Sequence, residues 1–294
     1  MFELLLTVQF VPDPTTWNGI PKGVIFSTFV SSFIFLLGFI GNRMYVKYTQ
    51  RQDLNTLKKY FCHIVSSLDK PISEQVDAFN KFSSFLKSKA SGELSLDSVS
   101  QFNITNLTNI KHSDLYAIFL GQRNFSDEAK ALNFQLYQSS IPVFENILKT
   151  FPEEFKRFMD IHNKYFEQWK SGIIAIRKYN DQCLGEAVAK GTKKGEDLLL
   201  EEIVLLHNKW AQTQDFQNAI VAATVFIKPF KELCKKHLDD TRAVTFSHHV
   251  IDCKDAADNL NALFDFYAVT FDNLSIRLEE ARARLKLSVQ FLQT

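Results

Sequence analysis

The residues best suited to metal chemistry in this 294-residue sequence are a histidine and a cysteine in its last fifth. In the run His248-His249-Val250-Ile251-Asp252-Cys253, His249 and Cys253 are four residues apart, so a helix places both on one face. A zinc site needs about four ligands, and His237 or Asp239 would have to supply the others. The sequence offers no second pair with ligand spacing. We interpret this run as the polar start of a helix and predict no metal site.

The motifs that bind phosphate or activate a nucleophile are missing from the sequence. Gly185 and Gly191 bracket five residues, but Thr192 follows where a phosphate-binding loop requires lysine. The acidic pairs Glu201-Glu202 and Asp239-Asp240 are adjacent in sequence, so a helix points the members of each pair in different directions. We expect no cofactor, and these patterns favour a non-enzymatic protein.

Two arginine–histidine spacings are the remaining candidates for catalysis. Four residues separate Arg157 from His162, and five separate Arg242 from His248. These R-x4-6-H spacings resemble the motif of the HEPN-type helical ribonucleases. The resemblance covers these residues alone, and it implies that the Arg and His act on RNA phosphates. His162 also lies on the apolar stripe of its predicted helix, so a histidine packed in the core is the alternative.

Helices are the elements expected to position these residues, since glycine and proline are scarce and apolar residues recur three and four apart. We predict helices at 72–90, 113–120, 126–150 with a kink at Pro142, 152–190, 196–213, and 215–238 with a kink at Pro229. The last helix is the clearest, because it keeps a heptad rhythm for about 50 Å. Its apolar positions are Leu260, Phe264, Tyr267, Phe271, Leu274, Leu278, Ala281, Leu285 and Leu292.

A membrane-spanning helix is predicted near the N-terminus. Residues 23–41 read GVIFSTFVSSFIFLLGFIG and carry no charge. As a helix they extend about 28 Å, close to the thickness of a hydrocarbon core. A cleaved signal peptide is the rival interpretation, but its apolar region is shorter and ends in a small-residue cleavage site.

The charges around this segment predict its orientation. Glu3, Asp13 and Lys22 precede it. A mainly basic set follows it, with a single acidic residue: Arg43, Lys47, Arg51, Asp53, Lys58 and Lys59. By the positive-inside rule, the N-terminus lies outside and the long C-terminal body lies in the cytoplasm, at the plasma (inner) membrane. The cysteines agree, because they are widely spaced and are predicted to be reduced, buried thiols. They are Cys62, Cys183, Cys234 and Cys253.

Two sets of residues predict association between copies of the chain. Small residues at Gly23, Ser27 and Ser31, with Gly38 one heptad later, share a face of the membrane helix and favour close helix packing. The alternatives are a mildly polar pore lining, or small residues that are merely tolerated. Beyond the membrane, a heptad seam is expected either to pair between subunits or to dock on the body. Its residues are Leu54, Leu57, Phe61, Ile64 and Leu68.

The predicted organisation has four parts. They are a short non-cytoplasmic segment at 1–19, the transmembrane helix at 20–42, a juxtamembrane amphipathic helix at 43–68 and a cytoplasmic helical domain at 69–294. Pro71 is expected to end the juxtamembrane helix. The polar residues 91–112 mark a possible boundary within the domain.

The fold class expected from these features is all-α: one N-terminal transmembrane helix, then an elongated cytoplasmic helical bundle with coiled-coil-like long helices. A formal net charge of +1 argues against general nucleic-acid binding. We expect a membrane-anchored homo-oligomer that scaffolds or senses an unidentified cytoplasmic protein. The alternatives are an oligomeric membrane effector or pore, as in prokaryotic defence systems, and a membrane-tethered HEPN-like ribonuclease.

Overall fold

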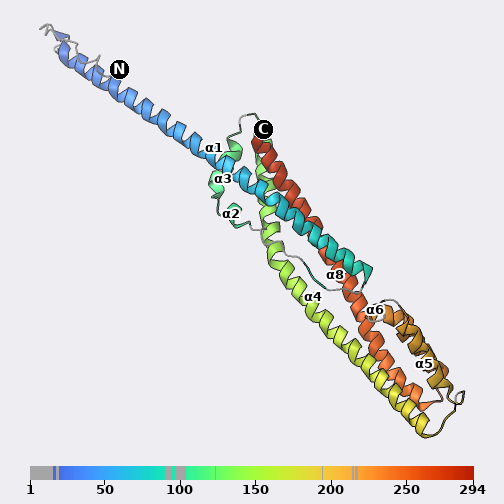
Figure 1. Cartoon of the computed structure of the whole chain (residues 1–294). Coiled ribbons are helices and arrows are strands. Elements are labelled where there is room, and N and C mark those ends of the chain that lie inside the picture. Colours follow the sequence, from blue (N-terminus) through green and yellow to red (C-terminus); the bar gives the residue numbers. More distant parts are fainter. Residues whose placement is uncertain are drawn as a thin grey trace. The chain divides into compact units, whose positions relative to one another are not determined.

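The structure is a computed structural model that describes residues 16–17, 20–90, 94–96, 104–122, 124–193, 195–213, 215 and 218–294. These residues are nearly all helical, which confirms the predicted all-α class (Figure 1). Contacts divide the chain into unit 1, Met1–Tyr60, and unit 2, Phe61–Thr294. The division falls inside the predicted juxtamembrane helix.

Unit 1 is built from a minimal strand pair and a helix. Strands β1 (Thr16–Trp17) and β2 (Ile20–Pro21) pair antiparallel, with Thr16 opposite Pro21. Helix α1 (Lys22–Ser88) begins directly after β2 and runs on into unit 2. Unit 1 therefore contains the predicted transmembrane segment as unbroken helix from Lys22, while most of the predicted N-terminal segment 1–19 lies outside the described residues.

The predicted end of the juxtamembrane helix at Pro71 is wrong, because α1 continues through this proline to Ser88. A proline inside a helix costs about 3 kcal/mol. The stripe around Pro71 is buried in unit 2, with Leu68 and Phe82 about 5 % exposed and Ile72 and Phe79 nearly inaccessible. Burying each such side chain contributes about 1.5–3 kcal/mol, so together they outweigh the proline.

Helix α4 (Asp127–Ala189) corrects a second prediction, because it joins the two helices expected at 126–150 and 152–190. Pro142 and Pro152 both lie inside it. The physical reason is again packing, since Phe144, Ile147 and Phe158 on either side of Pro152 are inaccessible to solvent. The predicted start is confirmed: the Ser126 hydroxyl accepts a hydrogen bond from the amide of Ala129 at 3.3 Å.

The remaining elements of unit 2 match the predicted helices closely. The helix predicted at 113–120 is α3 and the one at 196–213 is α5, whereas the one at 215–238 is interrupted by a π-helical turn just before Pro229. Pro229 has no backbone N–H to donate, and the extra residue of a π turn is one way in which a helix accommodates such a residue. The elements are α2 (Thr105–Thr108), α3 (His112–Leu120), α5 (Leu198–Ala211), α6 (Ala219–Ala222), η2 (Ala223–Ile227), α7 (Lys228–Lys236) and α8 (Thr241–Gln293).

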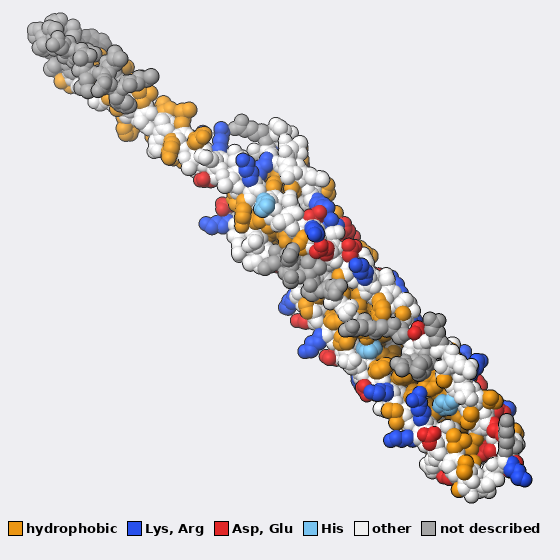
Figure 2. All heavy atoms as spheres, viewed as in Figure 1, with side chains coloured by type: hydrophobic (Ala, Val, Ile, Leu, Met, Phe, Trp, Pro, Cys, Tyr) orange, Lys and Arg blue, Asp and Glu red, His pale blue; other side chains and the backbone are white. Residues whose placement is uncertain are grey.

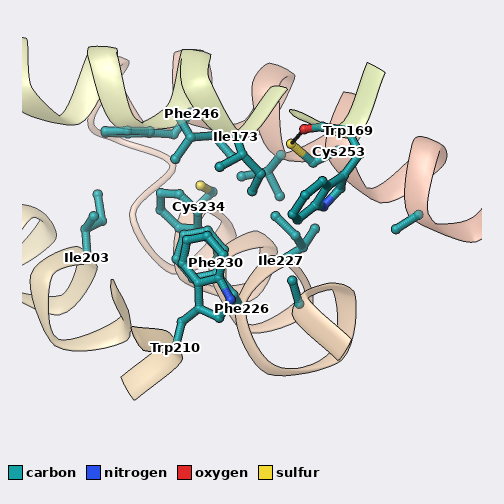
Figure 3. Close-up of a cluster of buried hydrophobic side chains, with 14 of the residues drawn as sticks. Trp169, Ile173, Ile203, Trp210, Phe226, Ile227, Phe230, Cys234, Phe246 and Cys253 are labelled. Atoms are coloured by element: carbon teal, nitrogen blue, oxygen red, sulfur yellow. Dashed lines mark hydrogen bonds between the residues drawn. The ribbon is translucent and has the colours of Figure 1, made fainter. Parts of the chain in front are cut away.

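Helices α4 and α8 lie side by side along unit 2 (Figure 1). The C-terminal half of α4 and the N-terminal half of α8 pack with α5, η2 and α7 around a core that is rich in aromatic rings (Figure 3). The rings of Trp210 and Phe226 stack with centroids 4.4 Å apart, and Phe230 links Phe226 to Phe246. The heptad positions of α8 from Leu260 to Leu292 are buried.

The C-terminal part of α1 packs against the other half of the α4–α8 pair. Phe82 makes edge-to-face contacts with Phe158 on α4 and Phe271 on α8, at centroid distances of 5.7 and 4.9 Å. The Ser83 hydroxyl donates a hydrogen bond to the carbonyl of Ala268 at 2.9 Å. Phenylalanine rings therefore supply contacts among all three helices.

Candidate functional site

The clearest candidate for function in unit 1 is the apolar surface at the start of α1. Among the described residues, α1 contains the one stretch that is long and apolar enough to cross a membrane, and none of that stretch is buried. Figure 2 shows its hydrophobic side chains at the surface. They are Val24, Phe26, Phe29, Phe33, Ile34, Phe35, Leu36, Leu37, Phe39 and Ile40, each 48–74 % exposed. Consecutive exposed positions from Phe33 to Leu37 cover the whole circumference of the helix.

Two hydroxyls near the start of this segment are bonded within the helix. The hydroxyls of Ser27 and Thr28 donate hydrogen bonds to the carbonyl of Val24, at 3.0 and 2.8 Å. A helix satisfies its backbone internally, and these contacts satisfy the side chains in the same way. These two hydroxyls therefore do not require water as a hydrogen-bond partner.

The predicted small-residue face lies on this same segment. A side-chain carbon added at Gly38 or Gly41 would meet nothing within 4 Å. Ser27 and Ser31 are exposed, and the surroundings of Gly23 lie outside the described side chains. Within unit 1, the face that begins at Ser27 is uncovered.

The structure separates the five residues of the predicted juxtamembrane seam. Leu54 and Leu57 belong to unit 1 and are partly exposed. Phe61, Ile64 and Leu68 belong to unit 2 and are buried in its core. The Phe61 ring contacts Tyr137 edge to face at 5.2 Å. From the sequence, this seam is expected either to pair between subunits or to dock on the body, and its C-terminal part docks on the body of its own chain.

The first arginine–histidine pair does not converge. Arg157 is exposed and His162 is half-buried, and five positions along α4 set them about 140° apart around the helix axis. The His162 ring stacks on Phe166 and Phe264, both at 5.8 Å. Burial lowers the pKa of His162 below its usual value of 6.5, and a hydrogen bond to Asn163 only partly opposes this. His162 occupies the position of a core histidine.

A pocket of about 250 Å³ borders His162. Its wall is mainly apolar, with Phe85, Phe166, Leu260 and Phe264 among its residues. The part of the lining that the structure describes holds no other acidic or basic side chain. General acid–base chemistry at His162 would therefore lack a charged partner to bind phosphate or to tune the imidazole.

The second pair is divided between an ion-pair network and solvent. The Arg242 guanidinium donates to Asp197 at 2.7 and 3.0 Å and to Asp240 at 2.6 Å. These bonds hold the pKa of both carboxyls below their usual value. Asp197 caps the start of α5 and Asp240 the start of α8, so Arg242 ties two helix N-termini together. His248 is exposed, six positions further along α8.

The two candidate zinc ligands, His249 and Cys253, differ in their exposure to solvent. Cys253 is inaccessible to solvent, its thiol lies 3.8 Å from the Trp169 carbonyl, and burial raises its pKa to about 12. His249 is partly exposed beside the Tyr179 ring. Over the described ranges, no group of three or more His, Cys, Asp or Glu residues could hold a metal ion. All four cysteines are buried thiols.

Sequence reasoning missed an exposed apolar row on α8, which we call the outer seam. Its residues are Ala262, Phe266, Val269, Asn273, Ile276, Glu280, Ala283 and Leu287, and all are exposed. The apolar members Phe266, Val269 and Ile276 are 57–63 % exposed. The spacing alternates strictly between four and three residues, two positions out of step with the buried seam. That alternation was the available signal, but the stronger buried pattern concealed it.

Comparison of the chain with protein-family models, with curated proteins and with solved structures finds no match. Functional inference for this protein therefore rests on the surfaces described above.

Proposed function

We propose that this chain is a membrane-anchored, non-enzymatic protein, held by the first part of α1. In this proposal unit 2 lies in the cytoplasm, and the chain acts by associating with itself and by binding a cytoplasmic protein. The observation that carries the proposal is the apolar surface that covers the full circumference of α1 near its start.

The energetic argument for an anchor follows from the exposed side chains. About ten large apolar residues between 24 and 41 are at least roughly half exposed. At about 1.5–3 kcal/mol for complete burial of each, leaving them in water forfeits on the order of 10 kcal/mol. That is comparable with the whole stability of a folded domain. A lipid environment removes this loss, and the internally bonded Ser27 and Thr28 hydroxyls add little cost there.

The residues that follow the apolar segment support the proposed orientation. Arg43, Lys47 and Arg51 come within ten residues of Gly41. Tyr45 and Tyr48 are 69 % and 67 % exposed beside them, and such rings favour the boundary between lipid and water. The positive-inside rule then assigns unit 2 to the cytoplasm.

Self-association is supported by the uncovered small-residue face, where Gly38 leaves open space for a second helix. The non-enzymatic part of the proposal is supported by the fate of the candidate residues, since Arg242 is engaged by two carboxylates and His162 packs among phenylalanine rings. A near-neutral net charge directs the search for a partner toward proteins rather than nucleic acid.

Alkaline extraction of membranes tests the anchor. We expect the full chain to stay in the membrane pellet, and the double variant Ile34→Arg/Leu37→Arg to be released. Each arginine near the centre of a span costs about 2.5–3.5 kcal/mol, so the pair costs about 5–7 kcal/mol. Leu132→Arg is the matched control, because Leu132 is 57 % exposed on α4 in unit 2. Release of the unaltered chain at alkaline pH would refute the anchor.

A further inference from the structure

The outer seam of α8 has the pattern of a helix that pairs with another helix. From Phe266 to Leu287 it spans three heptads, or about 32 Å. If Phe266 is an a position, then Val269, Ile276 and Ala283 are d positions and Leu287 is again an a position. The opposite side of α8 is already occupied, since Phe271, Leu278 and Leu285 are buried within unit 2. Only the arc that a partner would cover remains exposed.

The charges beside the outer seam identify the partner. The g positions carry Asp272 and Glu279, and the e positions five residues later carry Arg277 and Arg284. In a parallel pair of identical helices, a g residue faces the e residue of the next heptad on the partner. Asp272 then meets Arg277 of a second copy, and Glu279 meets Arg284 of that copy. Both contacts are attractive, and symmetry doubles each of them. Within one chain Asp272 also binds Lys87, Glu279 binds Arg282 and Arg284 binds Glu280, so the dimer contacts share these charges.

The same charges disfavour the antiparallel arrangement. Antiparallel helices bring g positions opposite g positions, and in the register described next this sets the Asp272 carboxylate against the Glu279 carboxylate of the second copy. The antiparallel register that overlaps the two outer seams along their whole length also places Asn273 opposite Ile276 and leaves its amide without a polar partner. In the parallel arrangement Asn273 faces Asn273 of the second copy, a contact that fixes register and favours two strands.

We propose that the outer seam of α8 is a homodimer interface, in which two copies of this chain pair in parallel and in register through Phe266, Val269, Asn273, Ile276 and Leu287. This deepens the self-association in the proposed function by naming its surface, and it does not depend on membrane insertion.

Glu280 limits the strength of this interface. It occupies an a position, so two carboxylates face each other in the dimer. The Arg284 guanidinium one turn later lies 3.2 Å from the Glu280 carboxylate and offsets part of the repulsion. The seam is therefore adjusted for reversible pairing rather than for maximal stability.

Cysteine cross-linking of the full chain in membranes or detergent tests both pairing and direction. In the parallel dimer, the Leu287 side chains of the two chains face each other. The Leu287→Cys variant therefore forms a disulfide between its two identical chains. In the antiparallel register two such cysteines are about 37 Å apart, and a mixture of Phe266→Cys and Ala283→Cys chains cross-links instead. The unaltered chain is the background, because its own cysteines are buried.

Substitutions that leave the fold intact provide the second measurement. We expect Ile276→Asp to raise the dimer dissociation constant about 100-fold or more, since each copy loses one apolar contact and gains a buried charge. Glu280→Leu should lower that constant at least about tenfold. Leu132→Asp, at an equally exposed position on α4, should not change it.

A cross-link between the Phe266→Cys and Ala283→Cys chains, or the absence of any cross-link in all cysteine variants, would overturn the proposal. An unchanged dissociation constant in an Ile276→Asp variant that retains its helicity would do the same. Alkaline extraction of the same variants reports the anchor separately. A chain that dimerises but is released from membranes refutes the anchor alone, and a monomer that stays in the membrane refutes the seam alone.

Discussion

Gly172 is the position where the packing of unit 2 can be tested most sharply. It lies on α4 directly against α8, and a side-chain carbon added to it would overlap the Cys253 sulfur. Cys253 is inaccessible to solvent, so its sulfur has no free space to move into. The substitution Gly172→Ala therefore tests whether the two long helices approach as closely as the structure has them.

Two opposing effects determine the expected magnitude. Alanine stabilises a helix interior by about 0.8–1.0 kcal/mol relative to glycine. Overpacking a filled core costs about 1–3 kcal/mol, and the backbone of Cys253 lies 3.5 Å away behind the sulfur. Because the added carbon overlaps the sulfur directly, we place the overpacking cost in the upper half of its range and expect a net destabilisation of about 1–2 kcal/mol. For a domain of this size, that lowers the melting temperature by about 2–8 °C.

The sign should reverse when the sulfur is removed. In a Cys253→Ala background the remaining contacts are ordinary van der Waals distances, so Gly172→Ala should stabilise the protein by about 1 kcal/mol. Gly185→Ala on the same helix is the matched control, since nothing lies within 4 Å of its added carbon, and it should also be stabilising. Thermal unfolding followed by circular dichroism measures all four variants. A Gly172→Ala chain that is stabilised without the Cys253 change would refute the close approach of α4 and α8.

Two further predictions concern the arginine–histidine candidates. Arg242→Met should destabilise unit 2 by about 1–3 kcal/mol at pH 7, since it leaves Asp197 and Asp240 without their cation. The pKa of both aspartates is lowered below 3.8 in the folded chain, so their contribution to stability is present above that pH and is lost as the pH falls. In denaturant unfolding, the difference in unfolding free energy between the variant and the unaltered chain should therefore shrink below about pH 4. His162→Phe should keep the fold at pH 7.5, because the ring already stacks on two phenylalanines. Because the pKa of His162 is lowered in the folded chain, the unfolded chain binds the proton more readily, and stability present above pH 6.5 is lost as the pH falls below it. The His162→Phe variant should therefore lose less stability than the unaltered chain between pH 7.5 and 5.5. An equal loss in both chains would contradict the burial of this histidine.

Helix positions were predictable from the sequence where periodicity and capping agree. Ser126 is followed by Asp127 and Glu128, and α4 starts there. Local rules failed at Pro71 and Pro152, since they assign a proline a fixed cost without counting what the surrounding stripe buries. The buried phenylalanines on both sides of these prolines exceed that cost, and they become decisive only when a partner helix is present.

Candidate site residues were less predictable, because spacing says nothing of what surrounds a side chain. Arg242 and His248 have a spacing that resembles a catalytic motif, yet the arginine binds two carboxylates that arrive from a helix start 45 residues earlier and from its own cap. The caps themselves were readable, since Asp197 and Asp240 each stand directly before a helix. That one arginine joins them depends on tertiary structure alone.

The two seams of α8 explain why helix association needed the structure. Leu260, Phe264 and Tyr267 begin one heptad row, and Ala262, Phe266 and Val269 begin another two positions away. A sequence that satisfies both rows predicts a helix packed on opposite sides, but it does not say which side the chain itself covers. The structure buries the first row against α1 and α4 and leaves the second exposed. The polar residues are then informative, because Asn273 and Glu280 occupy only the exposed row. An uninterrupted apolar row would pair more tightly and with less choice of register, whereas an amide and a carboxylate in the row lower the stability of pairing and restrict its register.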